Sequence, residues 1–239
     1  MKKHLIILKI KLKMTNKFLV IIPARKNSRR LISKNSKILC GKPLISYTIE
    51  YAIKNFHLDD IWVNTDDNKI ISIAKKYGVR TYLRKSELAT NTTLIGDTIY
   101  DQCKFFEKKK ISYQDIILLQ PTNPFRENFN INEVIKIYLS KNIKSLMTVS
   151  RINKKLGKIS NNKFLPFNYK FEQRSQKIES LYFENGALYI FNKDLVLNHK
   201  KLISDQVYPF ITSGVESEID IDYEEDFKAA ELYIKTNLI

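Results

Sequence analysis

A short basic segment near the N-terminus is the first candidate for chemistry. The eleven residues from Arg25 to Asn35 contain five cations and no carboxylate. These cations repel one another, so a folded loop of this composition requires a polyanion to neutralise it. Arginine binds phosphate oxygens in pairs and lysine binds them as a point charge, so a nucleoside triphosphate fits this loop. The alternative is a basic loop that is only solvated.

An acidic segment near the C-terminus complements the basic one. Glu218-Ile-Asp-Ile-Asp222 alternates strictly, which predicts a strand over Ser217–Asp222 with both isoleucines facing the core. Asp220 and Asp222 would then share the opposite face, about 6.5–7 Å apart. Two carboxylates at that spacing can bind Mg²⁺, which takes its other ligands from phosphates and water. The alternative is a solvent-facing edge strand that uses charge against aggregation.

A third segment, Leu119–Arg126, is a proline-rich loop that follows a predicted strand. Its two prolines stiffen the backbone, which suits holding polar side chains in fixed directions. Gln120, Thr122 and Asn123 are therefore candidate ligand-binding residues.

The net charge of the chain is concentrated in its N-terminal fifth. The 239 residues carry a formal charge of +16, yet residues 1–49 hold thirteen bases and no acid. Residues 1–15 are predicted to be a basic tail, disordered or upstream of the true start. Binding of this segment to nucleic acid or to an anionic membrane surface is the alternative function of another class. It predicts salt-dependent binding that disappears when residues 1–13 are removed, whereas an enzyme would be unaffected by that truncation.

Other counts exclude several classes of protein. Six glycines cannot supply a G-x-G-x-x-G or Walker loop here, and three well-separated histidines argue against a histidine-based metal site or triad. No stretch approaches the roughly 20 apolar residues of a membrane span. Two cysteines without metal-like spacing indicate a reduced, cytoplasmic setting.

The elements that must position these segments alternate between strand and helix. Buried strands are predicted at 18–24, 61–65, 79–83, 115–120, 145–150 and 187–191, and helices at 44–53, 67–77, 95–109, 131–139 and 224–234. This β-α-β alternation predicts an α/β fold with a mostly parallel sheet, helices on both faces, and ligands at the carboxyl ends of the strands. A polar stretch at about 151–185 is predicted to be an inserted arm or hairpin within one domain, residues 16–239.

Seven segments, in this order and spacing, resemble the acylneuraminate cytidylyltransferase family. They are IIPARKNSRRLISKN, GKPLISYTIE, VNTDD, LRKSELATNTT, LLQPTNPFR, ENGALYIF and IDIDYEEDF. The resemblance implies a Rossmann-like three-layer nucleotide-diphospho-sugar transferase fold, CTP as a substrate, Mg²⁺ as the cofactor, and a homodimer built partly through the arm. The implied reaction joins a nine-carbon 2-keto sugar acid, sialic acid or a relative, to CMP.

The resemblance also implies roles for individual residues. Nucleotide binding falls to Arg25, Asn27, Ser28, Arg29, Lys34, Asn35, Arg84, Asn91 and Thr93. The sugar acid falls to Gln120, Thr122, Arg174, Asn185 and Tyr189, and the metal to Asp220 and Asp222. Catalysis falls to Arg25, Arg29, Lys34 and Asp222, which would neutralise the departing pyrophosphate and place the metal.

The chain departs from the family pattern at several of these positions. Lys26 and Asn27 stand where two glycines are usual, Arg29 replaces a lysine, and Asn91 stands where aspartate is common. The spacing between Arg174 and Asn185 is more similar to enzymes for pseudaminic acid. CMP-pseudaminate, CMP-legionaminate and CMP-octulosonate synthesis therefore remain alternatives for the product.

Overall fold

A seven-stranded sheet forms the centre of the computed structural model, which describes residues 18–26 and 28–237. Its strands are β1 (Phe18–Pro23), β4 (Ile61–Thr65), β5 (Arg80–Leu83), β6 (Asp115–Leu118), β7 (Ser145–Ile152), β10 (Leu181–Asn192) and β11 (Tyr208–Thr212). They lie in the order β11-β7-β10-β6-β1-β4-β5. Among these described strands, only β10 pairs with its neighbours in antiparallel fashion. The predicted α/β fold with a mostly parallel sheet is confirmed.

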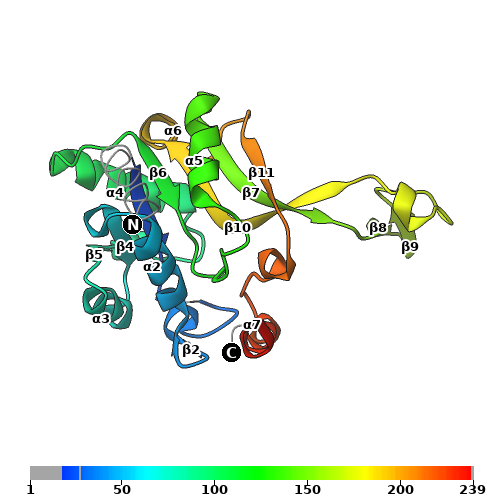
Figure 1. Cartoon of the computed structure of the whole chain (residues 1–239), viewed down its shortest axis with the longest axis horizontal. Coiled ribbons are helices and arrows are strands. Elements are labelled where there is room, and N and C mark those ends of the chain that lie inside the picture. Colours follow the sequence, from blue (N-terminus) through cyan, green and yellow to red (C-terminus); the bar gives the residue numbers. More distant parts are fainter. Residues whose placement is uncertain (1–17, 27, 238–239) are drawn as a thin grey trace, which may run out of the picture.

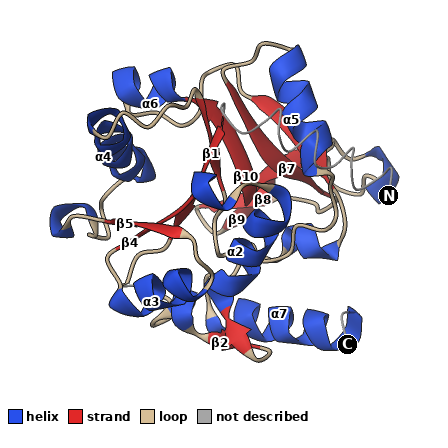
Figure 2. Ribbon diagram, turned by 60° about the vertical axis from the view of Figure 1, so that its left-hand side comes forward, coloured by secondary structure: helices blue, strands red, loops and turns tan. Residues whose placement is uncertain are grey.

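Helices cover both faces of this sheet, as Figure 2 shows. One face carries α2 (Leu44–Asn55), α3 (Asn68–Lys76) and α5 (Ile131–Ser140), and the other carries α4 (Ile95–Lys108) and α6 (Lys193–His199). Because successive side chains of a strand point to opposite faces, Val20 of β1 packs toward the first set and Ile21 toward the second. The three-layer prediction is therefore confirmed.

Local signals in the sequence account for most element boundaries. β1 is apolar throughout because its first five residues are buried between two helical layers. Helix α3 begins after Asp67, whose carboxylate accepts a hydrogen bond from the Lys69 amide at 2.8 Å. It ends before Gly78, which adopts a φ of 72°. The predicted helices agree with the structure within two or three residues at each end.

The predicted arm is a hairpin that projects from the body (Figure 1). Its tip consists of β8 (Gly157–Ser160) paired with β9 (Lys163–Pro166). β7 and β10 lead to and from it, and β10 carries a bulge between Glu184 and Tyr189, where Gly186 adopts a φ of 73°. The division into one domain and a basic tail stays a prediction, because residues 1–17 lie outside the described residues.

A small third core joins the two charged segments. Helix α7 (Glu224–Asn237) contributes Phe227 and Ile234, the acidic segment contributes Ile221, and the residues that follow β1 contribute Leu31 and Leu39. The residues that follow β1 include a short hairpin, formed by β2 (Ile38–Leu39) and β3 (Lys42–Pro43). This packing holds the basic loop against the acidic segment.

The strand predicted over Ser217–Asp222 is wrong. Val215–Glu218 form a turn of 3-10 helix, and the residues after it are extended but pair with no strand among the described residues. Their hydrogen bonds go to a loop instead: the Ile221 amide donates to the Thr122 carbonyl at 2.7 Å. One edge of the sheet is β11, a strand that contains a proline and was not predicted. Helix α6 was also not predicted.

The two cysteines offer a test of the core. Cys103 is buried in α4, and desolvation raises the pKa of its thiol to about 11, whereas Cys40 is partly exposed. At pH 8 the Cys103 thiol would therefore be almost entirely protonated, and it is shielded from solvent. We therefore expect iodoacetamide at pH 8 to alkylate Cys40 in the folded protein and both cysteines in urea, as measured by peptide mass spectrometry. Equal labelling in the folded protein would contradict this packing.

Candidate functional site

Three loops meet at the carboxyl ends of the strands, beside the point where the order of the strands reverses. The chain runs from β1 through β4 to β5, then returns to β6 on the other side of β1. In open α/β sheets, ligands bind outside the carboxyl ends of the strands at such a reversal. The basic loop follows β1, and the proline-rich loop follows β6. The third loop follows β5 and begins at Arg84.

A cavity of about 620 Å³ opens between these loops. Most predicted site residues line it: Arg25, Ser28, Arg29, Lys34, Asn35, Arg84, Asn91, Thr93, Gln120, Thr122 and Asp222. Five lining side chains are cationic and one is a carboxylate, so the cavity favours a polyanion. A second cavity of about 580 Å³, between α5 and α6, gathers none of the predicted residues.

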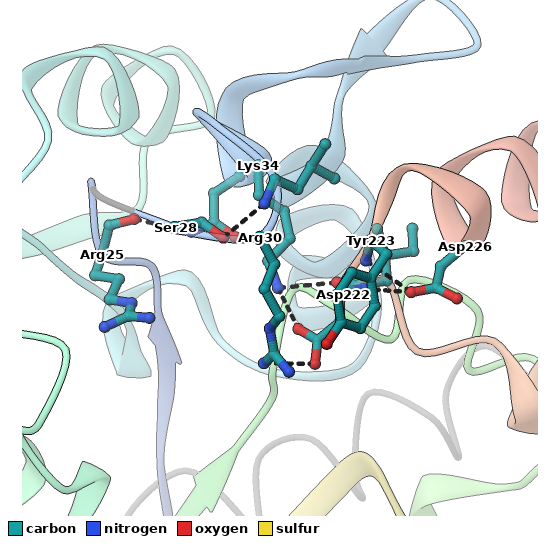
Figure 3. Close-up of polar contacts among 10 residues, drawn as sticks. Arg25, Ser28, Arg30, Lys34, Asp222, Tyr223 and Asp226 are labelled. Carbon is teal, nitrogen blue, oxygen red and sulfur yellow. Dashed lines mark hydrogen bonds and ion pairs between the residues drawn. The ribbon is translucent and has the colours of Figure 1, made fainter.

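Two cations converge on Asp222 in this cavity (Figure 3). Lys34 Nζ donates to Asp222 Oδ1 at 2.8 Å and to the Ile221 carbonyl at 2.8 Å, and only 8% of Lys34 is exposed. Arg30 Nη2 lies 2.7 Å from Asp222 Oδ2. A hydrogen bond that Arg30 donates to Tyr223 and the charge of Asp222 raise the pKa of Arg30. Both oxygens of this carboxylate are thus engaged by the basic loop.

The acidic segment is anchored by its isoleucines, and of its two predicted metal ligands Asp222 lines the cavity whereas Asp220 does not. Ile219 and Ile221 are buried, and the Asn123 amide donates to the Ile219 carbonyl at 3.1 Å. Asp220 is exposed and Asp222 half-buried, so burial alternates as predicted although the segment is not a strand. Although Asp220 is exposed as a residue, neighbouring atoms partly desolvate its carboxyl group and raise its pKa, and the charge of Asp222 adds to the rise.

The basic loop is held by polar contacts to its surroundings. Asn35 Nδ2 donates to the Arg25 carbonyl at 3.1 Å, and Arg25 Nη1 donates to the Thr90 carbonyl at 3.2 Å. The Lys26 amide donates to Asp66 Oδ1 at 2.8 Å. These bonds fix where the loop begins and ends. The predicted role of Asn27 lies outside the described residues.

The predicted sugar-binding residues are only partly brought together. Gln120 and Thr122 line the cavity, whereas Asn185 is 1% exposed. Its amide bonds internally, accepting from Thr148 and donating to two hydroxyl groups, each at 2.7 Å. Tyr189 is also buried and donates to Glu184, and burial raises its pKa. Arg174 is exposed on the arm and does not line the cavity.

Comparison with known proteins places the chain in a family. A cytidylyltransferase family model matches residues 19–237. The chain belongs to the cytidylyltransferase family. It is 30% identical over 227 residues to a CMP-N,N'-diacetyllegionaminic acid synthase of Legionella pneumophila subsp. pneumophila, covering 92% of this chain and 97% of that protein. This family membership makes the chain a nucleotidyltransferase.

Two further similarities bear on length and fold. An N-acylneuraminate cytidylyltransferase of Escherichia coli O18:K1:H7 is 34% identical over 224 residues, which cover 91% of this chain and 52% of that protein. The chain therefore spans about half the length of that relative. A solved CMP:2-keto-3-deoxy-manno-octonic acid synthetase complexed with CTP shares the fold, with a TM-score of 0.65, 16% identity, and coverage of 93% of this chain and 100% of that one.

The structure adds residues to the family-derived site. Arg30 pairs with Asp222 and lies over the Tyr223 ring, 5.2 Å from its centroid. Asp226 accepts hydrogen bonds from the amides of Asp222 and Tyr223, at 2.9 and 2.7 Å, and so fixes the backbone at the start of α7. The sequence signal for both was their place within the charged runs, which does not reveal the individual partners.

The carboxylates near the cavity limit the kind of metal site that this part of the chain can form. Among the residues that the structure describes, no group of three or more His, Cys, Asp or Glu side chains is arranged to hold a metal. Mg²⁺ in phosphate-transferring sites commonly takes one or two carboxylates and completes its shell with phosphates and water. Asp222 lines the cavity and Asp220 lies two residues before it, so the segment offers the one or two carboxylates that such an ion needs, but not the full ligand set of a metal held by protein alone.

No helix among residues 18–26 and 28–237 combines the length and the apolar character needed to cross a bilayer.

Proposed function

We propose that the chain transfers CMP from CTP to a nine-carbon 2-keto sugar acid, releasing pyrophosphate. The cationic cavity at the strand reversal carries this proposal, because it presents five positive side chains around the carboxylate of Asp222 in a cytidylyltransferase fold. The sialic acid and legionaminic acid named in two relatives make sugars of this class the first candidates. Pseudaminic and octulosonic acids are the alternatives.

The reaction forms one bond and breaks another at the α-phosphorus. The sugar's C2 hydroxyl oxygen attacks this phosphorus and loses its proton, and the bond to the bridging oxygen of the pyrophosphate breaks. Arg25, Arg29 and Lys34 would hold the triphosphate and neutralise the charge that develops on the leaving group. Such a transfer depends on positioning and charge neutralisation rather than on a covalent intermediate.

Asp222 would change partners as the nucleotide binds. Lys34 and Arg30 engage both of its oxygens in the structure. Phosphate oxygens would compete for these cations, which would leave the carboxylate available to a cation. Bound Mg²⁺ would supply charge compensation for the phosphates and make the attacking hydroxyl more acidic. Asp220 and Asp222 would hold it.

The test is pyrophosphate release in the presence of CTP, Mg²⁺ and a panel of sialic, legionaminic, pseudaminic and octulosonic acids. We expect release with one or more of the nine-carbon acids, and little release when ATP, GTP or UTP replaces CTP. Absence of release with every acid would overturn the proposal. A preference for octulosonic acid would retain the reaction and replace the sugar.

We also propose that two chains assemble through the arm. Apolar side chains are exposed on the arm: Ile159 is 78% exposed, Phe167 73% and Phe171 65%. An exposed apolar surface of this kind on a projecting hairpin is typical of a protein contact. A second chain could also bring an Arg174 side chain toward a cavity that the chain's own Arg174 does not line.

The assembly can be tested by mass in solution. We expect sedimentation equilibrium to give twice the mass of one chain for the wild type, and one chain for an Ile159→Asp, Phe171→Asp double variant, because burying two carboxylates in the contact is unfavourable. Leu232→Asp, at a 63% exposed position on α7, should leave the dimer intact. A monomeric wild type would refute the proposed contact.

A further inference from the structure

Arg84 lies in the wall of the cavity and is held by another residue's side chain. It follows β5 directly and is only 7% exposed. Its Nε donates to Asn64 Oδ1 at 2.8 Å, and its Nη2 donates to the Asn64 carbonyl at 3.3 Å. No carboxylate forms an ion pair with Arg84 among the described residues. The guanidinium is therefore oriented by neutral groups.

Asn64 is in turn fixed by a residue on the neighbouring helix. Its Nδ2 donates to Gln102 Oε1 of α4 at 2.7 Å, and both side chains are fully buried. Arginine only donates, so Asn64 must turn its oxygen toward Arg84 and its nitrogen toward Gln102. Gln102 must then present its oxygen. In this chain of hydrogen bonds, called here the relay, Arg84 donates to Asn64 and Asn64 donates to Gln102, and the reverse direction is impossible.

The backbone of Asn64 also touches the other side of the cavity. Its carbonyl accepts the Ala24 amide at 2.9 Å, immediately before the first cation of the basic loop. The Arg84 amide donates to the neighbouring Thr65 carbonyl at 2.9 Å. Asn64 is thus placed where the loops after β1 and β5 meet.

The arrangement leaves Arg84 able to bind a ligand. A guanidinium has five N–H donors, and the two bonds to Asn64 leave others for the cavity that Arg84 lines. Desolvation lowers the pKa of Arg84 to about 10, so the group remains charged at neutral pH. A desolvated, charged fork held rigidly suits an oxygen acceptor of a nucleotide.

We infer that Asn64 and Gln102 are positioning residues that hold Arg84 in the orientation needed to bind CTP. The inference rests on the proposed function, since it takes CTP as the ligand of this cavity. Nothing in the local sequence indicates it, because Asn64 lies near the end of a buried strand, before Thr65, and Gln102 lies on a helix that covers the core.

The experiment measures CTP affinity by calorimetry with Mg²⁺ present, together with kcat and KM for pyrophosphate release. Asn64→Leu has a similar volume but cannot accept from Arg84. We expect it to raise Kd and KM for CTP by about ten- to a hundredfold, with kcat within about threefold of the wild type. Gln102→Met should raise both by less, because Arg84 keeps its direct partner.

Conservative variants separate positioning from packing. Asn64→Asp keeps an acceptor for Arg84, and the Gln102 amide can turn to donate to the other carboxylate oxygen. Its Kd for CTP should stay within about threefold of the wild type. Cys103→Ala removes a buried side chain from the same helix beside Gln102, so it should lower the melting temperature without changing Kd.

Each outcome has a definite meaning. An Asn64→Leu protein that melts like Cys103→Ala and binds CTP as tightly as the wild type would overturn the relay and leave the proposed function intact. Equal loss of affinity in Asn64→Leu and Asn64→Asp would also overturn it. If Asn64→Leu does not fold, unchanged CTP affinity in Gln102→Met would overturn the relay in its place. A folded wild type that does not bind CTP would overturn the proposed function and this inference together.

Discussion

Replacing Asp222 with alanine is expected to lower kcat/KM for pyrophosphate release by about a hundred- to a thousandfold, or roughly 2.7–4 kcal/mol in transition-state free energy. Asp222 lies between Lys34 and Arg30, at 2.8 and 2.7 Å, on the wall of the cationic cavity. The variant would lose one of the two carboxylates proposed to hold the cation that compensates phosphate charge. Steady-state assays with CTP and the preferred sugar acid measure the effect.

Charge, rather than volume, should decide the result. Asp222→Asn keeps the shape and should lose nearly as much activity as Asp222→Ala, and both should require more Mg²⁺ for half-maximal rate. Glu224→Ala is the matched control. Glu224 lies two residues after Asp222 and its carboxylate pairs with Lys37 at 2.6 Å, but it does not line the cavity. Its rate should stay within about threefold of the wild type, since exposed ion pairs contribute little. An Asp222→Ala enzyme with near wild-type activity would refute the metal assignment.

The repeated strands and helices could be predicted because their signals are local. β1 and β4 are short apolar runs, and α2 repeats its apolar residues at helical spacing. Alternation of such elements leads to a mostly parallel sheet, and the basic loop then falls at a strand end. Composition directed the prediction of a polyanion site to this loop, because residues 1–49 hold thirteen bases and no acid.

The acidic segment shows where periodicity is insufficient. Ile219 and Ile221 are buried and Asp220 is exposed, as an alternating pattern predicts. The backbone of this segment forms hydrogen bonds with the carbonyl of Thr122 and with the side-chain amide of Asn123. Both residues belong to a loop far away in the sequence. A strand is defined by pairing with another strand, and alternation does not report which groups supply the hydrogen bonds. β11 was missed for the converse reason: it pairs as a strand, but its short sequence includes Pro209.

The hydrogen-bond partners of individual side chains are the feature of the structure that is hardest to predict from the sequence. Family resemblance assigns Asn185 to the sugar acid, yet its amide is consumed by Thr148, Ser150 and Thr212. The relay through Asn64 gives no sequence signal for a similar reason, because an amide side chain can donate or accept. Its direction is fixed only when Arg84 is placed beside it. The charged residues of a site can thus be predicted before the neutral residues that orient them.

Arg126 is a buried charged residue that holds the loop after β6, and its loss should have the largest effect on stability. The side chain is 1% exposed and forms no ion pair with a carboxylate among the described residues. Its Nε donates to the Ala187 carbonyl at 2.7 Å, its Nη1 to Thr48 Oγ1 at 3.0 Å, and its Nη2 to the Gln120 carbonyl. It therefore joins α2, β10 and the loop after β6.

Two effects oppose each other when Arg126 is replaced with methionine. Removing a buried charge relieves the desolvation that lowers the pKa of Arg126 to about 10. However, the Ala187 carbonyl and the Thr48 hydroxyl, both buried acceptors, lose a charged donor. The Gln120 carbonyl keeps a hydrogen bond from the backbone amide of Asn123 at 3.3 Å. Each buried group left without a partner costs about 1–3 kcal/mol. Because the site is packed on three sides, we expect these losses to dominate, with the free energy of unfolding falling by about 3 kcal/mol.

Urea unfolding followed by circular dichroism measures this change. Arg80→Met is the matched control, because Arg80 is exposed on β5 and its pairing with Asp59 at 2.7 Å is a surface ion pair. Its loss should cost no more than about 1 kcal/mol. Arg126→Lys keeps the charge but replaces a planar fork by one ammonium group that cannot reach all three acceptors, so it should destabilise the protein at least as much as methionine does. Equal midpoints for Arg126→Met and Arg80→Met would show that the three contacts do not stabilise the fold, and that Gln120 is positioned by the prolines of its own loop.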